Sequence, residues 1–284
     1  MKNSEEIKEM VRDRYTKIAE HDKELNSSCF CGDGSCDSPI PGFTVFSDDY
    51  TKLEGYVPEA DLGLGCGLPT EFALIKEGDT VVDLGSGAGN DCFVARSITG
   101  VSGRVIGIDF TEIMIEKARA NAAKLGYENV QFRFGDIEKM PLTSGIADVV
   151  ISNCVLNLVP DKQKAFSEIF RILKAGGHFS VSDVVLIGEL PEKLSQAAAV
   201  YAGCIAGALQ KSDYLQVIKN AGFVNVTVQK DKVIHVPDNL LLEYISNEEL
   251  SEFRNTGAGI FSITVYADRP AETKECGESC GCNS

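Results

Sequence analysis

Short runs of β-branched and aromatic residues alternate with segments of helical periodicity through the middle of the chain. This alternation is typical of parallel βα units, in which a helix crosses over from each strand to the next. The predicted strands cover 80–84, 103–108, 130–134, 147–152 and 178–185, and the predicted helices cover 89–98, 111–125 and 161–173. Five strands with three crossover helices predict an α/β protein with a doubly wound, Rossmann-like sheet.

The segments around this core have patterns of their own. Apolar residues recur at helical spacing over 5–19, which predicts an amphipathic helix, and an irregular stretch rich in Gly, Pro and Asp is expected over 39–67. The glycines of 174–177 are the expected terminator of the helix before them. Beyond the core we expect an Ala-rich helix over 194–209, a helix over 212–221, and strands over 223–229 and 260–267 that complete the sheet and cover one edge.

The charge of the chain limits its partners. Its 284 residues include 27 Lys and Arg against 42 Asp and Glu, a formal net charge of −15. This excess of acid repels the phosphates of nucleic acids and anionic lipid surfaces, so neither is an expected partner. The N-terminus lacks the pattern of a signal peptide, and no stretch reaches the roughly 18 apolar residues of a membrane span. A folded cytoplasmic protein is therefore expected.

Ten cysteines are the unusual feature of the composition. In a reducing compartment, cysteines in a chain of this size are more often ligands or redox groups than a disulfide framework. They form an N-terminal cluster, a C-terminal cluster and four single positions: Cys29, Cys31 and Cys36; Cys276, Cys280 and Cys282; and Cys66, Cys92, Cys154 and Cys204. Both clusters lie in sequence rich in Gly, Ser and acidic residues, which is typical of a loop or a tail.

A glycine-rich turn, in VVDLGSGAGN at 81–90, follows the first predicted strand. Such a turn lets a ligand approach the backbone and the N-terminus of the next helix. A dinucleotide fingerprint has glycine at its first, third and sixth positions, but here Gly85 and Gly87 are followed by a third glycine one residue too early, at Gly89. The strand also ends with the carboxylate of Asp83, an unfavourable neighbour for a pyrophosphate. The turn therefore favours a cationic ligand.

Acidic residues follow the next two strands. Asp109 lies 24 residues after Gly85, near the spacing at which an acidic residue accepts hydrogen bonds from ribose hydroxyls, and Phe110 follows it. Asp136 follows the third strand, where its carboxylate can accept a hydrogen bond from an adenine amino group while a neighbouring backbone N–H, such as that of Ile137, donates to the ring. Because these strand ends lie in register, they predict one nucleoside pocket.

Three motifs, DLGSGAG at 83–89, GID at 107–109 and GDI at 135–137, resemble in this order those of the class I S-adenosylmethionine-dependent methyltransferases. The resemblance covers residues 70–185 and implies a seven-stranded methyltransferase sheet with S-adenosylmethionine as methyl donor. Taken singly, a glycine turn can be only a tight turn and a strand-end Asp only a helix cap. An NAD-type Rossmann oxidoreductase is the alternative.

The acceptor site offers little for general-base chemistry. Each of the three histidines is expected to be structural: His21, His178 and His235. Cys154 instead follows the fourth strand, at the edge where doubly wound folds bind ligands, so we expect its thiol to face the reactive methyl group. The alternative is that such a cysteine is a small buried hydrophobe.

Cysteine-containing motifs narrow the family. ADLGLGCG at 60–67, DLGSGAGNDCF at 83–93, ISNCVLNLVPDK at 151–162 and YAGCIAGAL at 201–209 resemble those of the arsenite methyltransferases, and the likeness runs over most of 5–225. The resemblance implies that Cys154 and Cys204 hold trivalent arsenic, that Cys66 is a third thiolate or a redox partner, and that Asn153 lines the cofactor pocket. The resemblance also implies one additional functional cysteine in the N-terminal cluster. We assign this position to Cys36, with Cys29 and Cys31 as the alternatives.

The chain is expected to comprise four regions. They are an N-terminal helix and Cys-containing loop over 1–69, an S-adenosylmethionine-binding domain over 70–190, a C-terminal α+β substrate region over 191–270, and a Cys-rich tail over 271–284. The tail thiols could capture arsenite and pass it inward, or they could lie unused in solvent.

Thiolates suit As(III) because it is a soft centre, and sulfur-bound As(III) keeps a lone pair that can attack a sulfonium methyl. Methylation formally oxidises the arsenic, so a reductant such as glutathione or thioredoxin is expected, together with arsenite or its thiol conjugates as substrate. A disulfide between Cys66 and another site cysteine is an expected intermediate. Two alternatives to arsenite methylation stay open, namely a methyltransferase acting on a small organic metabolite and a cysteine-based metalloid-binding protein.

Overall fold

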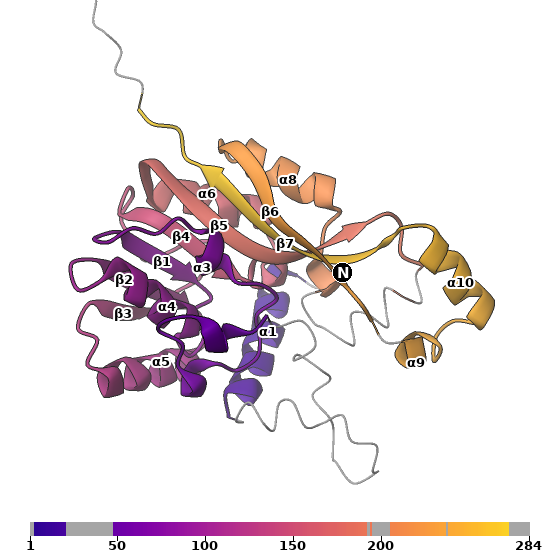
Figure 1. Ribbon diagram of the computed structural model, residues 1–284, viewed down its shortest axis with the longest axis horizontal. Coiled ribbons are helices and arrows are strands. Elements are labelled where there is room, and N and C mark those ends of the chain that lie inside the picture. Colours follow the sequence, from indigo (N-terminus) through magenta and orange to yellow (C-terminus); the bar gives the residue numbers. More distant parts are fainter. Residues whose placement is uncertain (1–2, 21–47, 192–193, 195–204, 237, 273–284) are drawn as a thin grey trace, which may run out of the picture.

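The computed structural model describes residues 3–20, 48–191, 194, 205–236 and 238–272. Its centre is a seven-stranded sheet with the strand order β3-β2-β1-β4-β5-β7-β6 (Figure 1). The first five strands pair in parallel, whereas β7 runs antiparallel to both β5 and β6. Strands β2 and β3 lie on one side of β1, whereas β4 and β5 lie on the other. The boundary between β1 and β4 is therefore the topological switch point, where doubly wound sheets bind ligands. The predicted α/β, Rossmann-like class is confirmed.

All seven predicted strands are present. They are β1 (Thr80–Leu84), β2 (Arg104–Asp109), β3 (Val130–Phe134), β4 (Ala147–Asn153), β5 (Leu173–Ile187), β6 (Val224–Ile234) and β7 (Gly259–Asp268). β5 and β6 are longer than predicted because both pair with the long β7 along most of its length. This antiparallel extension projects beyond the parallel part of the sheet.

Helices cover both faces of the sheet. α4 (Asn90–Thr99) and α5 (Glu112–Leu125) pack on one face, and α6 (Lys162–Ile172) and α8 (Lys211–Asn220) pack on the other. Successive side chains of a strand point to opposite faces. Accordingly, Val81 of β1 packs with α4 and α5, while Val82 packs on the α6 side.

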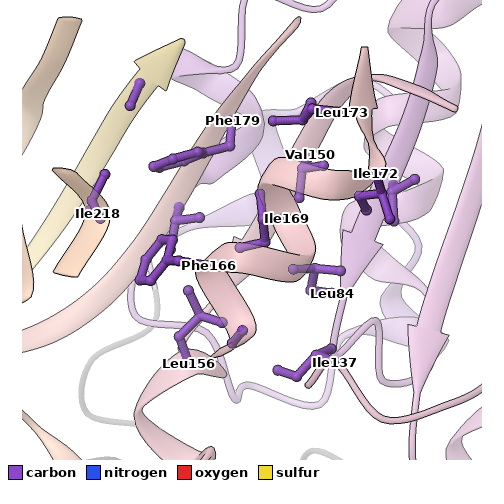
Figure 2. Packing of buried hydrophobic residues seen from close by; sticks show 14 of the residues in the cluster. Leu84, Ile137, Val150, Leu156, Phe166, Ile169, Ile172, Leu173, Phe179 and Ile218 are labelled. Carbon is purple, nitrogen blue, oxygen red and sulfur yellow. The ribbon is translucent and has the colours of Figure 1, made fainter. Parts of the chain in front are cut away.

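The core on the α6 side is well filled. Figure 2 shows Phe166 and Ile169 of α6 among Leu84, Val150 and Phe179 of the sheet, all of which are fully buried. Burying one such side chain contributes about 1.5 to 3 kcal/mol to stability. This packing fixes the carboxyl ends of β1 and β4, which carry the candidate site.

The remaining helices lie at the margins. α1 (Ser4–Ala19) begins at a capping box between Asn3 and Glu6, as the amphipathic pattern predicts. The short α3 (Pro69–Phe72) precedes β1, and Figure 1 shows α9 (Asp238–Leu241) and α10 (Asn247–Asn255) at the far end of the β6–β7 ribbon. In the described part of the chain, no helix has both the length and the apolar character needed to cross a membrane.

Two local predictions were wrong in detail. α6 ends at Ile172 and its C-cap is already extended, so Gly176 and Gly177 lie inside β5 instead of ending the helix. A Cβ on Gly177 would lie 2.8 Å from the carbonyl oxygen of Asp148, beside a shift in the β4–β5 register. These glycines therefore allow the two strands to approach at an irregularity.

The helix expected over 194–209 does not continue to its predicted end. Leu194 is helical, residues 195–204 lie outside the described residues, and Ile205–Gly207 forms the 3-10 turn η4. The irregular character expected over 39–67 is confirmed for the described residues from 48 onward. This stretch contains only two short 3-10 turns, η1 (Tyr50–Lys52) and η2 (Pro58–Ala60).

Candidate functional site

A pocket opens at the carboxyl ends of β1, β2 and β4. Every residue predicted from the strand-end motifs lines it: Asp83, Gly85, Gly87, Asp109, Phe110, Asp136, Ile137 and Asn153. Cys154 lines the same pocket. The fold thus brings the predicted nucleoside site and one predicted thiol together.

The glycine turn after β1 forms the floor of the pocket. Gly85 and Gly87 have φ values of +65° and +51°, in the left-handed region that glycine tolerates best. A Cβ on Gly85 would also lie 2.4 Å from a methyl group of Val155. The turn that would face the ligand therefore packs directly against the residue after Cys154.

Two buried polar atoms in the pocket residues have hydrogen-bonding capacity that the described part of the protein does not use. Among the described residues, the buried Ser86 Oγ and Asn90 Oδ1 have no hydrogen-bond partner. Leaving such atoms unsatisfied costs about 1 to 3 kcal/mol each. A polar ligand seated in the turn would satisfy them.

Asp109 and Asp136 lie at one end of the pocket. Asp109 accepts hydrogen bonds from the backbone N–H groups of Gly87, at 3.0 Å, and Thr111, at 2.8 Å. Asp136 accepts from the backbone N–H of Glu138, at 2.8 Å, and from Nζ of Lys8, at 2.7 Å. Both carboxylates are held in fixed orientations, and each oxygen keeps acceptor capacity for hydroxyl or amino groups of a nucleoside.

The other end of the pocket holds two carboxyl groups, the buried Asp83 and the partly buried Asp91. Burial raises the pKa of Asp91 to about 6, and burial together with the charge of Asp91 raises the pKa of Asp83 well above its usual range. Cys92 is fully buried and donates its S–H to Asp83 at 3.2 Å. Because a bound cation would favour the charged carboxylates, this end suits an amino group or a sulfonium.

Asn153, the last residue of β4, connects the elements of the site. Its Oδ1 accepts from the backbone N–H of Cys66 at 3.0 Å, and its Nδ2 donates to the Tyr50 hydroxyl at 2.5 Å and to the Gly67 carbonyl at 2.8 Å. The Tyr50 hydroxyl in turn donates to the Asp91 carboxylate at 2.9 Å. Asn153 therefore holds the Cys66 loop beside Cys154 and the acidic end of the pocket.

Tyr50 and Asp91 were not predicted as site residues. Asp91 lies in the first turn of α4, within the GNDCF segment, and the only available signal was its position directly after the glycine turn. Tyr50 lies in a region that we read only as irregular.

Cys66 and Cys154 lie in one apolar cluster with exposures of 1% and 4%. Cys154 has φ +61°, and its N–H donates to the Ser182 carbonyl at 2.8 Å. For a residue with a Cβ this left-handed conformation costs about 1 to 2 kcal/mol, and such strain is often found at functional sites.

The glycines around Cys66 allow its loop to pack closely. A Cβ on Gly65 would lie 2.6 Å from Asn153, and one on Gly67 would lie 2.6 Å from the Ser182 hydroxyl. The Cys66 carbonyl accepts from the Ser262 hydroxyl at 2.6 Å. The loop is therefore fixed from both β4 and β7.

Cys204 lies outside the described residues, but the segment directly after it is placed. Ile205 is buried in the same cluster as Cys66 and Cys154. A Cβ on Gly207 would lie 2.0 Å from the carbonyl oxygen of Asn157, in the 3-10 turn η3 (Leu156–Leu158) just after Cys154. The segments that follow the two predicted arsenic ligands are therefore in contact.

The predicted Cys36, its alternatives Cys29 and Cys31, and the three tail cysteines also lie outside the described residues. His178 is structural as expected, because its Nε2 lies 2.6 Å from the Ala73 carbonyl and not in the pocket.

The sequence did not reveal a buried hydrogen-bonded pair, Tyr214 and Asp183, that lies near Cys66 and Cys154. Tyr214 donates its hydroxyl to Asp183 at 3.1 Å, and both side chains are fully buried. Burial raises the pKa of Asp183 to about 7, while the charge of Lys162 opposes the shift. Burial and Asp183 raise the pKa of Tyr214, and Cys66 and Cys154 are close enough to add to that rise.

Comparison with known proteins gives a consistent result. Residues 75–222 match the family model described as a methyltransferase domain. An arsenite methyltransferase of Halobacterium salinarum is 39% identical over 276 residues, which are 95% of this chain and 68% of the relative. One of Aquipseudomonas alcaligenes is 34% identical over 84% of this chain and 68% of its own length.

A solved structure points the same way. The crystal structure of an arsenic(III) S-adenosylmethionine methyltransferase from Chlamydomonas reinhardtii superposes with a TM-score of 0.61 and 33% identity, covering 74% of this chain and 68% of that one. The alignment with the Halobacterium protein leaves little of this chain unmatched. The chain belongs to the arsenite methyltransferase family of S-adenosylmethionine-dependent methyltransferases.

Proposed function

We propose that this protein transfers a methyl group from S-adenosylmethionine to trivalent arsenic held by cysteine thiolates. The observation that carries the proposal is the position of Cys154, whose thiol lines the nucleoside pocket and shares an apolar cluster with Cys66. A thiol held at the wall of a methyl-donor pocket can present a soft acceptor to the methyl group.

The pocket residues divide the work of binding the methyl donor. Asp109 would accept hydrogen bonds from the ribose hydroxyls, Asp136 and the backbone N–H of Ile137 would meet the adenine, and Phe110 would pack against it. At the other end Asp83 would face the positively charged amino-acid part, and the glycines of the turn would admit the ligand to the backbone. The unpartnered Ser86 and Asn90 atoms support this fit.

The thiols take the place of a general base. Cys154 and Cys204 would ligate As(III), and Cys66 would be the third thiolate or a redox partner. When bound, S-adenosylmethionine supplies a methyl group on a positively charged sulfur, which the arsenic lone pair can attack. Transfer would form an As–C bond, break the S–C bond with its electron pair left on sulfur, and take arsenic formally from As(III) to As(V).

Restoring As(III) then requires two electrons. Two thiols, from glutathione, thioredoxin or the protein's own cysteines including Cys36, supply them and become a disulfide. Arsenite or its thiol conjugates would be the substrate, and the cytoplasm, where thiols remain reduced, would be the location.

The test is the release of S-adenosylhomocysteine by the full chain, measured with and without arsenite in the presence of glutathione. We expect release that depends on arsenite. Equal release without arsenite but with small organic acceptors would contradict the proposal in favour of an organic methyltransferase. Tight arsenite binding without any release would contradict it in favour of a sequestering protein.

The pH dependence of cofactor binding follows from Asp91. Because burial raises its pKa to about 6, Asp91 is protonated below that pH in the unliganded protein, and a cationic ligand must displace the proton. We expect the affinity for S-adenosylmethionine to fall by up to about tenfold per pH unit below pH 6, as measured by calorimetry. Asp91→Asn should weaken binding at pH 8 and flatten this dependence. A wild-type affinity that stays constant from pH 5 to pH 8 would be inconsistent with the assigned role.

The same shift has a consequence for stability. The folded state raises the Asp91 pKa from its usual 3.8, so it binds the proton more tightly than the unfolded chain does. The contribution of Asp91 to the free energy of unfolding of the unliganded protein should therefore decrease as the pH rises from about 4 to about 6. Asp91→Asn should remove this decrease.

A further inference from the structure

One face of α1 forms part of the pocket wall. Lys8, Val11 and Tyr15 all line the pocket, and their spacing of three and four residues places them on one side of the helix. The end of α1 is anchored, because Ile18 and Ala19 are buried, and the helix also contacts α5. α1 is therefore a docked element with a polar contact at the pocket.

Lys8 makes that contact. Its ammonium pairs with Asp136 at 2.7 Å and also with Glu138, whose side chain is only 3% exposed. Glu138 is held in turn by the backbone N–H of Asp161, which donates to it at 2.8 Å. The side chain of Lys8 is only 16% exposed and that of Asp136 is 39% exposed, so one cation and two carboxylates form a partly buried cluster at the pocket. Such a cluster would leave uncompensated negative charge if the cation were removed.

Arg12, one turn further along α1, makes a second contact at the same end. Its guanidinium lies over the ring of Phe110, 5.7 Å from the centroid. Cation–π contacts of this kind stabilise by about 0.5 to 1 kcal/mol at exposed sites. Lys8 and Arg12 thus touch the two side chains that border the proposed adenine position.

We propose that α1 is the adenosine-side wall of the cofactor site and that Lys8 is the residue that positions Asp136 for the adenine amino group. The inference rests on the proposed function only in taking the ligand to be an adenosine-containing cofactor. Lys8 and the Glu138 N–H fix opposite oxygens of the Asp136 carboxylate, and each oxygen keeps a lone pair for the adenine.

The test compares ligands that differ in how much of the pocket they fill. Calorimetry would measure the Kd of adenosine and of S-adenosylhomocysteine for the full chain and for Lys8→Met, which keeps the length and helical preference of the side chain. We expect both Kd values to rise by the same factor, about tenfold, as for loss of a hydrogen bond to a charged group. The dissociation rate of S-adenosylhomocysteine, measured by stopped flow, should rise with it.

Three matched variants separate positioning from a general effect on the fold. Lys17→Met changes an exposed lysine of the same helix and should leave both Kd values unchanged. Lys8→Arg keeps the charge and should retain most of the affinity. Asp91→Asn changes the other end of the pocket, so it should weaken S-adenosylhomocysteine while leaving adenosine unaffected.

The outcomes are distinguishable. Unchanged adenosine affinity in Lys8→Met would overturn the inference and leave the proposed function intact. A parent chain that bound neither ligand would overturn both. A parent that bound both ligands, with the expected Lys8 effect but without arsenite-dependent turnover, would support the inference and overturn the arsenic assignment alone.

Discussion

Replacing Cys154 with serine is expected to lower the rate of arsenite methylation by about 100-fold, because a hard hydroxyl replaces a soft thiolate and the arsenic loses its position at the methyl group. Binding of S-adenosylmethionine should persist, since the carboxylates and glycines of the pocket are untouched. Calorimetry for the cofactor, together with initial rates at saturating arsenite, would measure both effects.

The backbone at Cys154 provides a control. Its φ of +61° is strained for serine as well as for cysteine, whereas glycine adopts it readily. Cys154→Gly should therefore fold without this strain and be just as inactive, which would exclude misfolding as the cause. Activity in Cys154→Ser above a tenth of the parent's would show that this thiol is not an arsenic ligand.

Gly207→Ala is expected to lower kcat/KM for arsenite by about tenfold or more while leaving the Kd of S-adenosylmethionine unchanged. The added Cβ would lie 2.0 Å from the Asn157 carbonyl oxygen. Asn157 is itself fixed, because its Nδ2 donates to the Val184 carbonyl at 2.6 Å. The segment after Cys204 would have to move away from the segment after Cys154, and the proposed thiol ligands would separate.

A second glycine serves as the control for Gly207. At Gly126 a Cβ would meet no atom within 4 Å, although its φ of +67° adds some backbone strain. Gly126→Ala should therefore lower thermal stability slightly and leave arsenite kinetics unaffected. Normal arsenite kinetics in a folded Gly207→Ala protein would contradict the proposed contact between the two segments.

The residues that line the pocket could be predicted from the sequence because topology alone brings them together. Asp83 and Asp109 lie at the carboxyl ends of β1 and β2, and Asp136 follows β3. The carboxyl ends of neighbouring parallel strands share one edge of the sheet. No knowledge of side-chain packing is needed for that conclusion. The same reasoning placed Cys154 correctly in the pocket.

The hydrogen bonds that connect the site could not be predicted because they depend on tertiary contacts. Asn153 joins Tyr50 and Cys66, which are separated from it by 103 and 87 positions in the chain, and no local pattern records such hydrogen bonds. Lys8 resembles any lysine on an amphipathic helix until the helix docks. Gly176 and Gly177 were wrongly predicted to end α6, because glycine is common both at helix ends and where strands approach closely.

Methylation of arsenic by this protein is best tested through the identity of the methylated product. The purified protein would be incubated with arsenite, a thiol reductant and S-adenosylmethionine carrying a deuterated methyl group, and arsenic species would be separated by chromatography with element-specific and molecular mass detection. We expect deuteromethyl groups on arsenic in amounts equal to the S-adenosylhomocysteine formed, and about 100-fold slower formation of methylated arsenic with Cys154→Ser or Cys204→Ser. Formation of S-adenosylhomocysteine with all the arsenic recovered as unmethylated arsenite would contradict it.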